Sequence, residues 1–147
     1  MPEKEKISKS KQGKKNRAAG ARFELKVRTQ LESEGWIIDK WGNNVDFEEP
    51  EGKLVKAKRK YNPFMKIIAI GTGFPDFICF KLKDKQNYDV IGVEVKSNGY
   101  LDKTERAKAK FYLKNKIFSK FLIAKSKKEG RRILVEYVDF KDKYNKT

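Results

Sequence analysis

The chain has 147 residues, which suffices for one domain with a substantial hydrophobic core and hardly for two. Its 36 basic and 20 acidic residues give a formal net charge of +16, so a polyanion is the natural partner, with solubility alone as the alternative explanation. The absence of histidine, together with a single cysteine, excludes imidazole zinc sites, Ser-His hydrolases, histidine-based ribonucleases and disulfide frameworks. Any hydrolytic chemistry therefore has to use carboxylates, lysine, hydroxyl groups and a hard metal ion such as Mg²⁺.

The first segment, residues 1–16, is polar and rich in lysine, and we expect a disordered basic arm there. Such an arm either binds phosphates non-specifically or is a solvated tail. The N-terminus is charged rather than apolar, and no apolar run approaches the roughly 20 residues that cross a bilayer. We therefore expect a soluble, intracellular protein, cytoplasmic or associated with the nucleoid, without a membrane partner.

The elements that follow predict a single α/β domain over residues 17–147. Apolar periodicity indicates a helix over 17–34, and a strand should follow over 36–41. Residues 43–66 are mostly polar and predict a basic loop that turns at Pro50 and Gly52 and ends in a short strand over 66–70. Further strands are expected over 77–82, 90–95, 121–124 and 133–138, and a helix capped by Asp102 over 103–115, with Ala107, Phe111 and Tyr112 facing inward.

Two carboxylates stand out at the ends of the central strands. Asp76 and Glu94 are equidistant from Lys85 in the turn between those strands, so antiparallel pairing places them opposite one another. Two like charges there repel unless a cation lies between them, which favours a metal ion. Lys96 projects from the same face as Glu94 because side chains alternate along a strand. The alternative is that Asp76 only ends a turn, while Glu94 and Lys96 form a solvated face.

Glu24 supplies a third acidic group in the first helix. It lies on the helix face that also carries Val27 and Leu31, where an unpaired charge is costly. Metal coordination, direct or through water, would compensate that charge; the alternative is a glutamate at the rim that reaches solvent or pairs with Arg28. Cys79 lies in an apolar run and is expected to be a core residue rather than a nucleophile.

The motif Pro75-Asp76, followed by Glu94-Val95-Lys96 and preceded by the helical Glu24, resembles the PD-(D/E)xK nuclease superfamily. The arrangement is closest to archaeal-type Holliday junction resolvases and virus-type replication-repair nucleases. The resemblance covers residues 17 to about 138 and implies a restriction-endonuclease-like αβββαβ core, with a mixed central sheet flanked by helices.

The resemblance also implies a role for each residue of the motif. Asp76, Glu94 and the Val95 carbonyl would hold Mg²⁺ or Mn²⁺, with Glu24 as an outer or second-metal ligand, and Lys96 would orient the attacking water. Related nucleases often carry a glutamine where Glu105 stands here, so an auxiliary role for Glu105 is not expected to carry over.

The expected function is a metal-dependent endonuclease that acts on branched or junction DNA as a homodimer, since two symmetric nicks call for two sites. The alternatives are a restriction- or repair-type nuclease of other specificity and a nucleic-acid-binding module without catalysis. A basic run is expected to contact the nucleic-acid backbone. Its members are Lys53, Lys56, Lys58, Arg59 and Lys60.

Overall fold

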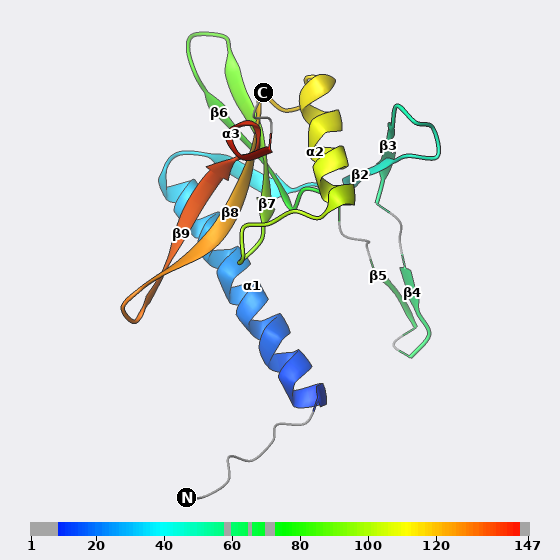
Figure 1. The fold of residues 1–147 in the computed structure, drawn as a ribbon, viewed down its shortest axis with the longest axis vertical. Helices are drawn as coiled ribbons and strands as arrows, with labels where there is room; N and C mark the ends of the chain where they lie inside the picture. Colours follow the sequence, from blue (N-terminus) through cyan, green and yellow to red (C-terminus); the bar gives the residue numbers. More distant parts are fainter. Residues whose placement is uncertain (1–8, 58–59, 65, 70–72, 145–147) are drawn as a thin grey trace, which may run out of the picture.

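The computed structural model of the chain describes residues 9–57, 60–64, 66–69 and 73–144 (Figure 1). A mixed five-stranded sheet in the order β1-β6-β7-β8-β9 forms its centre. Only β7 and β8 run parallel, and the other neighbouring pairs are antiparallel. The strands are β1 (Ile37–Lys40), β6 (Phe77–Leu82), β7 (Tyr88–Val95), β8 (Lys120–Glu129) and β9 (Arg132–Asp139).

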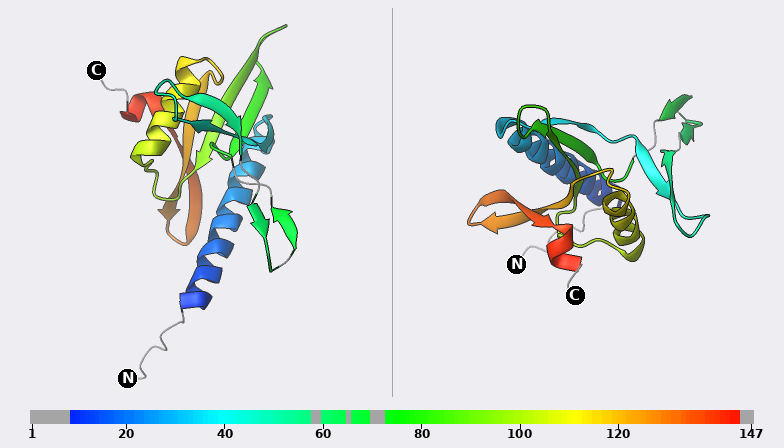
Figure 2. Two further views of the ribbon diagram at one scale, coloured as in Figure 1. Left: turned by 90° about the vertical axis from the view of Figure 1, so that its right-hand side faces the viewer. Right: turned by 90° about the horizontal axis from the view of Figure 1, so that it is seen from above.

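Helices cover both faces of this sheet (Figures 1 and 2). On one face, helix α1 (Lys9–Ser33) packs Phe23, Val27 and Leu31 against buried side chains of β6 and β7. On the other face, helix α2 (Lys103–Lys114) and the short helix α3 (Phe140–Tyr144) pack against β8. The predicted mixed α/β class is confirmed, and the crossover through α2 accounts for the parallel pairing of β7 with β8.

Helix α1 begins at Lys9, earlier than the sequence analysis predicts. Residues 9–16, expected in the disordered arm, are therefore helical, whereas residues 1–8 lie outside the described part of the chain. Lysine, glutamine, arginine and alanine are good helix formers, and no proline interrupts them after Lys9. The prediction placed the boundary at the first apolar residues, although helix propensity extends beyond them.

The region expected to be one long basic loop contains two small hairpins. In the first, Val45 is buried and the turn reverses at Gly52, whose φ of 85° suits glycine. The predicted turn is confirmed, but the loop around it is wrong, because exposed polar residues also form strands once they pair. The strands are β2 (Asn43–Asp46), β3 (Lys53–Lys56), β4 (Lys60–Asn62) and β5 (Ile67–Ala69), the last lying within the short strand predicted over 66–70.

The inward face of α2 agrees with the prediction at Tyr112 and differs from it at Ala109. Ala109 and Tyr112 are buried, whereas Ala107 and Phe111 are only partly buried. The Asp102 cap and the extent of the helix agree with the prediction. Cys79 is fully buried and burial raises the pKa of its thiol to about 12, as expected for a core residue. Within the described residues, no helix is long and apolar enough to cross a membrane.

Tyr112 connects α2 to the segment that leads into β6. Its hydroxyl accepts a hydrogen bond from Trp41 Nε1 at 3.0 Å and donates one to the Phe74 carbonyl, and its side chain is completely buried. The rings of Trp41, Tyr112 and Phe118 pack around this hydroxyl at centroid distances of 4.9 to 6.1 Å. The Tyr112 hydroxyl therefore holds the segment that enters β6, from the face of the sheet opposite α1.

We predict that Tyr112→Phe lowers the free energy of unfolding by about 1–3 kcal/mol, because it leaves a buried carbonyl and an indole N–H without a partner. Urea denaturation measures the change. Tyr137→Phe is the matched control, since the Tyr137 hydroxyl is buried without a hydrogen-bond partner among the described residues. That variant should be neutral or more stable. Equal losses in the two variants would contradict the role given to the Tyr112 hydroxyl.

Candidate functional site

Asp76 and Glu94 meet where β6 begins and β7 ends. The pairing of Phe77 with Val93, continued by one residue, brings them side by side. The Asp76 N–H donates a hydrogen bond to Glu94 Oε1 at 3.1 Å, and the Val95 N–H donates one to Asp76 Oδ2 at 2.8 Å. The opposition predicted from chain symmetry about Lys85 is therefore confirmed.

The segment before Asp76 is held closely against the end of β1. The Phe74 N–H donates to the Asn43 carbonyl at 2.9 Å, and the Trp41 N–H donates to the Asp76 carbonyl at 3.1 Å. A Cβ atom on Gly73 would lie only 2.0 Å from the Trp41 carbonyl oxygen, so only glycine fits there. These backbone contacts give Asp76 a defined position directly before β6.

Glu94 is the one charged residue that is buried among those whose side chains the structure describes, with 5% of its surface exposed. Burial raises the pKa of its carboxyl, and the neighbouring charge of Asp76 raises it further. Lys96 opposes this shift, but its Nζ lies 3.9 Å from Glu94 Oε2. The pair Asp76–Glu94 is thus short of positive charge, which is the environment that suits a bound cation.

Glu24 lies on α1, half-buried, and faces toward the same end of the sheet. Burial raises the pKa of its carboxyl, the charge of Asp76 adds to the effect, and Lys40 opposes it. Arg28 pairs with Glu32 at 3.0 Å, and no ion pair between Arg28 and Glu24 is found among the described residues. A shallow pocket of about 230 Å³ opens beside Glu24 and is lined by Ala21, Glu24, Leu25, Arg28, Lys40 and Phe77.

The three acidic residues do not form a closed cage. Across the described part of the chain, no three histidine, cysteine, aspartate or glutamate side chains gather closely enough to hold a metal ion by themselves. Glu24 therefore senses the charge of Asp76 without joining the Asp76–Glu94 pair. The Val95 N–H points toward Asp76, and its carbonyl lies on the same side of the strand because both groups of one residue do so.

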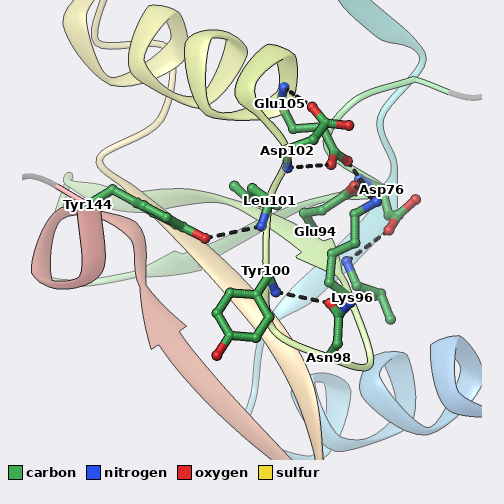
Figure 3. Close-up of polar contacts among 10 residues, drawn as sticks. Asp76, Glu94, Lys96, Asn98, Tyr100, Leu101, Asp102, Glu105 and Tyr144 are labelled. Carbon is green, nitrogen blue, oxygen red and sulfur yellow. Dashed lines mark hydrogen bonds and ion pairs between the residues drawn. The ribbon is translucent and has the colours of Figure 1, made fainter.

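Lys96 is held by Glu105, which the sequence analysis did not expect to act in the site (Figure 3). Its Nζ lies 2.7 Å from Glu105 Oε2, closer than to Glu94. Burial lowers the pKa of Lys96, but the ion pair with Glu105 outweighs that effect and the net shift is upward. Lys96 therefore stays charged at the mouth of the carboxylate pair.

Glu105 also caps α2. Its Oε1 accepts a hydrogen bond from the Asp102 N–H at 3.0 Å, while Asp102 Oδ1 accepts one from the Glu105 N–H at 2.8 Å. This capping box is visible in the sequence as an aspartate followed three residues later by a glutamate. The contact between Glu105 and Lys96 is not visible in the sequence, because it depends on the path that residues 97–102 take from β7 to α2.

Of the residues expected to contact nucleic acid, the structure describes Lys53 and Lys56 on the β2–β3 hairpin and the backbone of Lys60. Lys53 and Lys56 are exposed on β3, in a hairpin that packs beside α2 (Figure 1). Lys60 begins β4, and Lys58 and Arg59 lie outside the described residues. Comparison with family models, curated proteins and solved structures finds no match for this chain. The resemblance to PD-(D/E)xK nucleases accordingly rests on the motif residues.

We predict that Glu94→Gln makes the metal-free protein more stable at pH 8, by about 1 kcal/mol or more. The pKa of the Glu94 carboxyl is raised in the folded state from its ordinary 4.5. The contribution of the protonated carboxyl to the free energy of unfolding is therefore complete below pH 4.5 and is lost as the pH rises towards the raised pKa. Urea denaturation with EDTA at pH 5 and pH 8 measures this. The wild type should lose stability over that interval, and the variant should lose less. Parallel slopes would contradict the prediction.

A second prediction separates the two roles of Glu105. Glu105→Ala should lower the free energy of unfolding by about 1 kcal/mol, because the cap and the ion pair are both lost. Glu105→Gln keeps the capping hydrogen bond and should lose less than half as much. Chemical denaturation of both variants decides the matter, and equal losses would assign the whole effect to the ion pair with Lys96.

Proposed function

We propose that this chain is a divalent-metal-dependent endonuclease that hydrolyses phosphodiester bonds in DNA. The observation that carries the proposal is the hydrogen-bonded pair of the partly buried Asp76 and the buried Glu94, with Lys96 at its mouth, in a chain of net charge +16. Local negative charge in a strongly basic protein calls for a specific reason. A site that binds a hard cation next to a polyanion supplies one.

The donor set suits Mg²⁺ or Mn²⁺. Asp76 and Glu94 offer carboxylate oxygens, and the Val95 carbonyl lies on the same side of the strand. These are the hard oxygen ligands that such ions prefer, and Glu24, within electrostatic reach of Asp76, would accept a hydrogen bond from a coordinated water. A bound metal ion would polarise the phosphate and lower the pKa of a coordinated water.

We propose that Lys96 acts on the phosphate side of the site. Its amino group carries a positive charge within 3.9 Å of Glu94, and Glu105 fixes its position. A fixed ammonium group stabilises the negative charge that develops on a phosphate oxygen during attack by water. Glu105 thus takes an orienting role that the resemblance does not supply.

The sheet order is consistent with the restriction-endonuclease-like core that we propose for the domain. Strands β1, β6 and β7 form an antiparallel meander, α2 crosses over, and β8 pairs parallel with β7. We further propose branched or junction DNA as the substrate and a homodimer as the active form, because a resolvase introduces two symmetric nicks. Both follow from the resemblance, and a panel of branched and linear substrates tests the first.

We predict that the purified protein cleaves DNA in the presence of Mg²⁺ or Mn²⁺, and that Asp76→Asn or Lys96→Ala lowers the rate at least ~100-fold. Gel assays on labelled four-way junctions, flaps and duplexes measure the rate. Asp84→Asn is the control, since it makes the same chemical change in the exposed turn at the far end of the β6–β7 hairpin. Its activity should match the wild type.

The alternative of a nucleic-acid-binding module without catalysis gives a different result in the same experiment. A wild type that binds every substrate and cuts none, with either metal, would refute the nuclease and leave binding alone. Cleavage that survives in Asp76→Asn would instead move the chemistry away from this pair.

A further inference from the structure

Only the second half of α1 is accounted for by the core. Phe23, Val27 and Leu31 are buried, whereas the side chains described from Lys11 to Arg22 are exposed, apart from the partly exposed Gly13. Figures 1 and 2 show this first half of the helix standing clear of the sheet. Burial among the residues that the structure describes therefore gives no reason for the composition of this half of the helix.

The composition of this exposed half is strongly one-sided. Residues 9–22 contain six basic residues and no acidic one, and Glu24 is the first acid along the helix. Like charges at helical spacing repel one another and lower helix stability. A polyanion that binds along the helix would remove that penalty, which points to a nucleic acid as the partner of this surface.

The helix brings part of this charge onto the face that carries Glu24. Lys14, Arg17, Ala21 and Glu24 follow one another at spacings of three, four and three residues, which places them on one side of a helix. Lys15 and Arg22 are seven residues apart and lie on another side, roughly 120° around the axis at 100° per residue. The helix therefore has a basic face in line with the site and a basic face away from it.

The face in line with the site is open. A Cβ atom on Gly20, beside Ala21, would meet nothing within 4 Å. One on Gly13 would meet only the guanidinium of Arg17, at 3.6 Å from Nη1. Small residues on this side thus leave room for a bulky ligand to approach the helix backbone.

The spacing along the helix suits a duplex. At 1.5 Å per residue, Arg17 lies about 10 Å and Lys14 about 15 Å from Glu24 along the axis. The phosphates of one strand of B-DNA follow every 3.4 Å of axis, so these side chains would meet phosphates roughly three and four base pairs from the cleaved bond.

We propose that the face of α1 carrying Lys14 and Arg17 is a phosphate-binding track for the duplex arm that enters the Asp76–Glu94 site. The inference rests on the proposed function for the identity of the arm. The track adds phosphate contacts at defined positions to the general electrostatic attraction exerted by the net charge of +16. It holds the substrate on the α1 side of the carboxylates, opposite the side on which Glu105 holds Lys96.

The test compares two double variants with the same loss of charge. Lys14→Gln/Arg17→Gln removes the track, and Lys15→Gln/Arg22→Gln removes two charges from the other face of the same helix segment. Glutamine keeps the helix propensity, which circular dichroism checks. Binding to a 20-base-pair duplex is measured by fluorescence anisotropy in EDTA, over a series of salt concentrations.

We expect the track variant to weaken binding about 10-fold and to lower the slope of log K against log salt by about 2, while the control variant changes the affinity less than about 3-fold. Equal losses in both variants would reduce the effect to general electrostatics and overturn the track. No loss in either variant would overturn it as well. A track variant that loses affinity only for single strands would overturn the duplex assignment.

The design keeps this inference separate from the proposed catalysis, because binding is measured without a metal ion. A wild type that binds duplex DNA through the track but does not cut it with Mg²⁺ or Mn²⁺ would refute the nuclease and support the track. A wild type that cuts DNA with unchanged affinity in the track variant would support the nuclease and refute the track.

Discussion

The reciprocal hydrogen bonds between Asp76 and the Glu94–Val95 segment are the constraint on which the rest of the structure depends. They join the first residue before β6 to the last residues of β7, at the centre of the sheet. Because the register continues from this point, Phe77 and Val93 face α1 and complete its core cluster. A shift of the strand register by one residue would turn the Phe77 or Val93 side chain to the opposite face of the sheet. One strand register therefore sets both the position of the two acids and the packing of α1.

Helices on both faces of the sheet contribute residues that act on this pair or on its neighbours. From the α1 side, Glu24 lies within electrostatic reach of Asp76. From the α2 side, Tyr112 fixes the Phe74 carbonyl, and Glu105 fixes Lys96. Burying Glu94 is unfavourable by itself, since desolvation disfavours its charged form. The surrounding packing holds the carboxylate in place regardless, as is typical of sites where position matters more than stability.

Much of this arrangement follows from the sequence because it depends on local rules. Short runs rich in apolar residues mark β6 and β7, and the symmetry of Asp76 and Glu94 about Lys85 sets their register. The β2–β3 hairpin was missed because Asn43, Lys53 and Lys56 are poor strand formers that become strands only through pairing. The Lys96–Glu105 contact was missed because it joins a strand to a helix through a loop whose path no periodicity reports. The early start of α1 was missed because the residues described from Lys11 to Asn16 are exposed, or partly exposed at Gly13, and so show no apolar periodicity.

The distribution of charge explains why these parts belong together. Under the proposed function, a chain of net charge +16 attracts nucleic-acid phosphates in general, whereas the negative charge of the pair Asp76–Glu94 repels them at the site itself. Lys96 alone does not reverse this, because its ammonium group is already paired with Glu105 at 2.7 Å. An approaching phosphate therefore needs a further positive charge between the carboxylates, and a divalent cation has both the charge and the oxygen preference to provide it. Under the proposed function, the basic surface concentrates the nucleic acid and the acidic pair selects where a metal ion and a phosphate meet. The exposed basic half of α1 connects these two roles. Its Lys14 and Arg17 lie on the same helix face as Glu24, which is within electrostatic reach of Asp76.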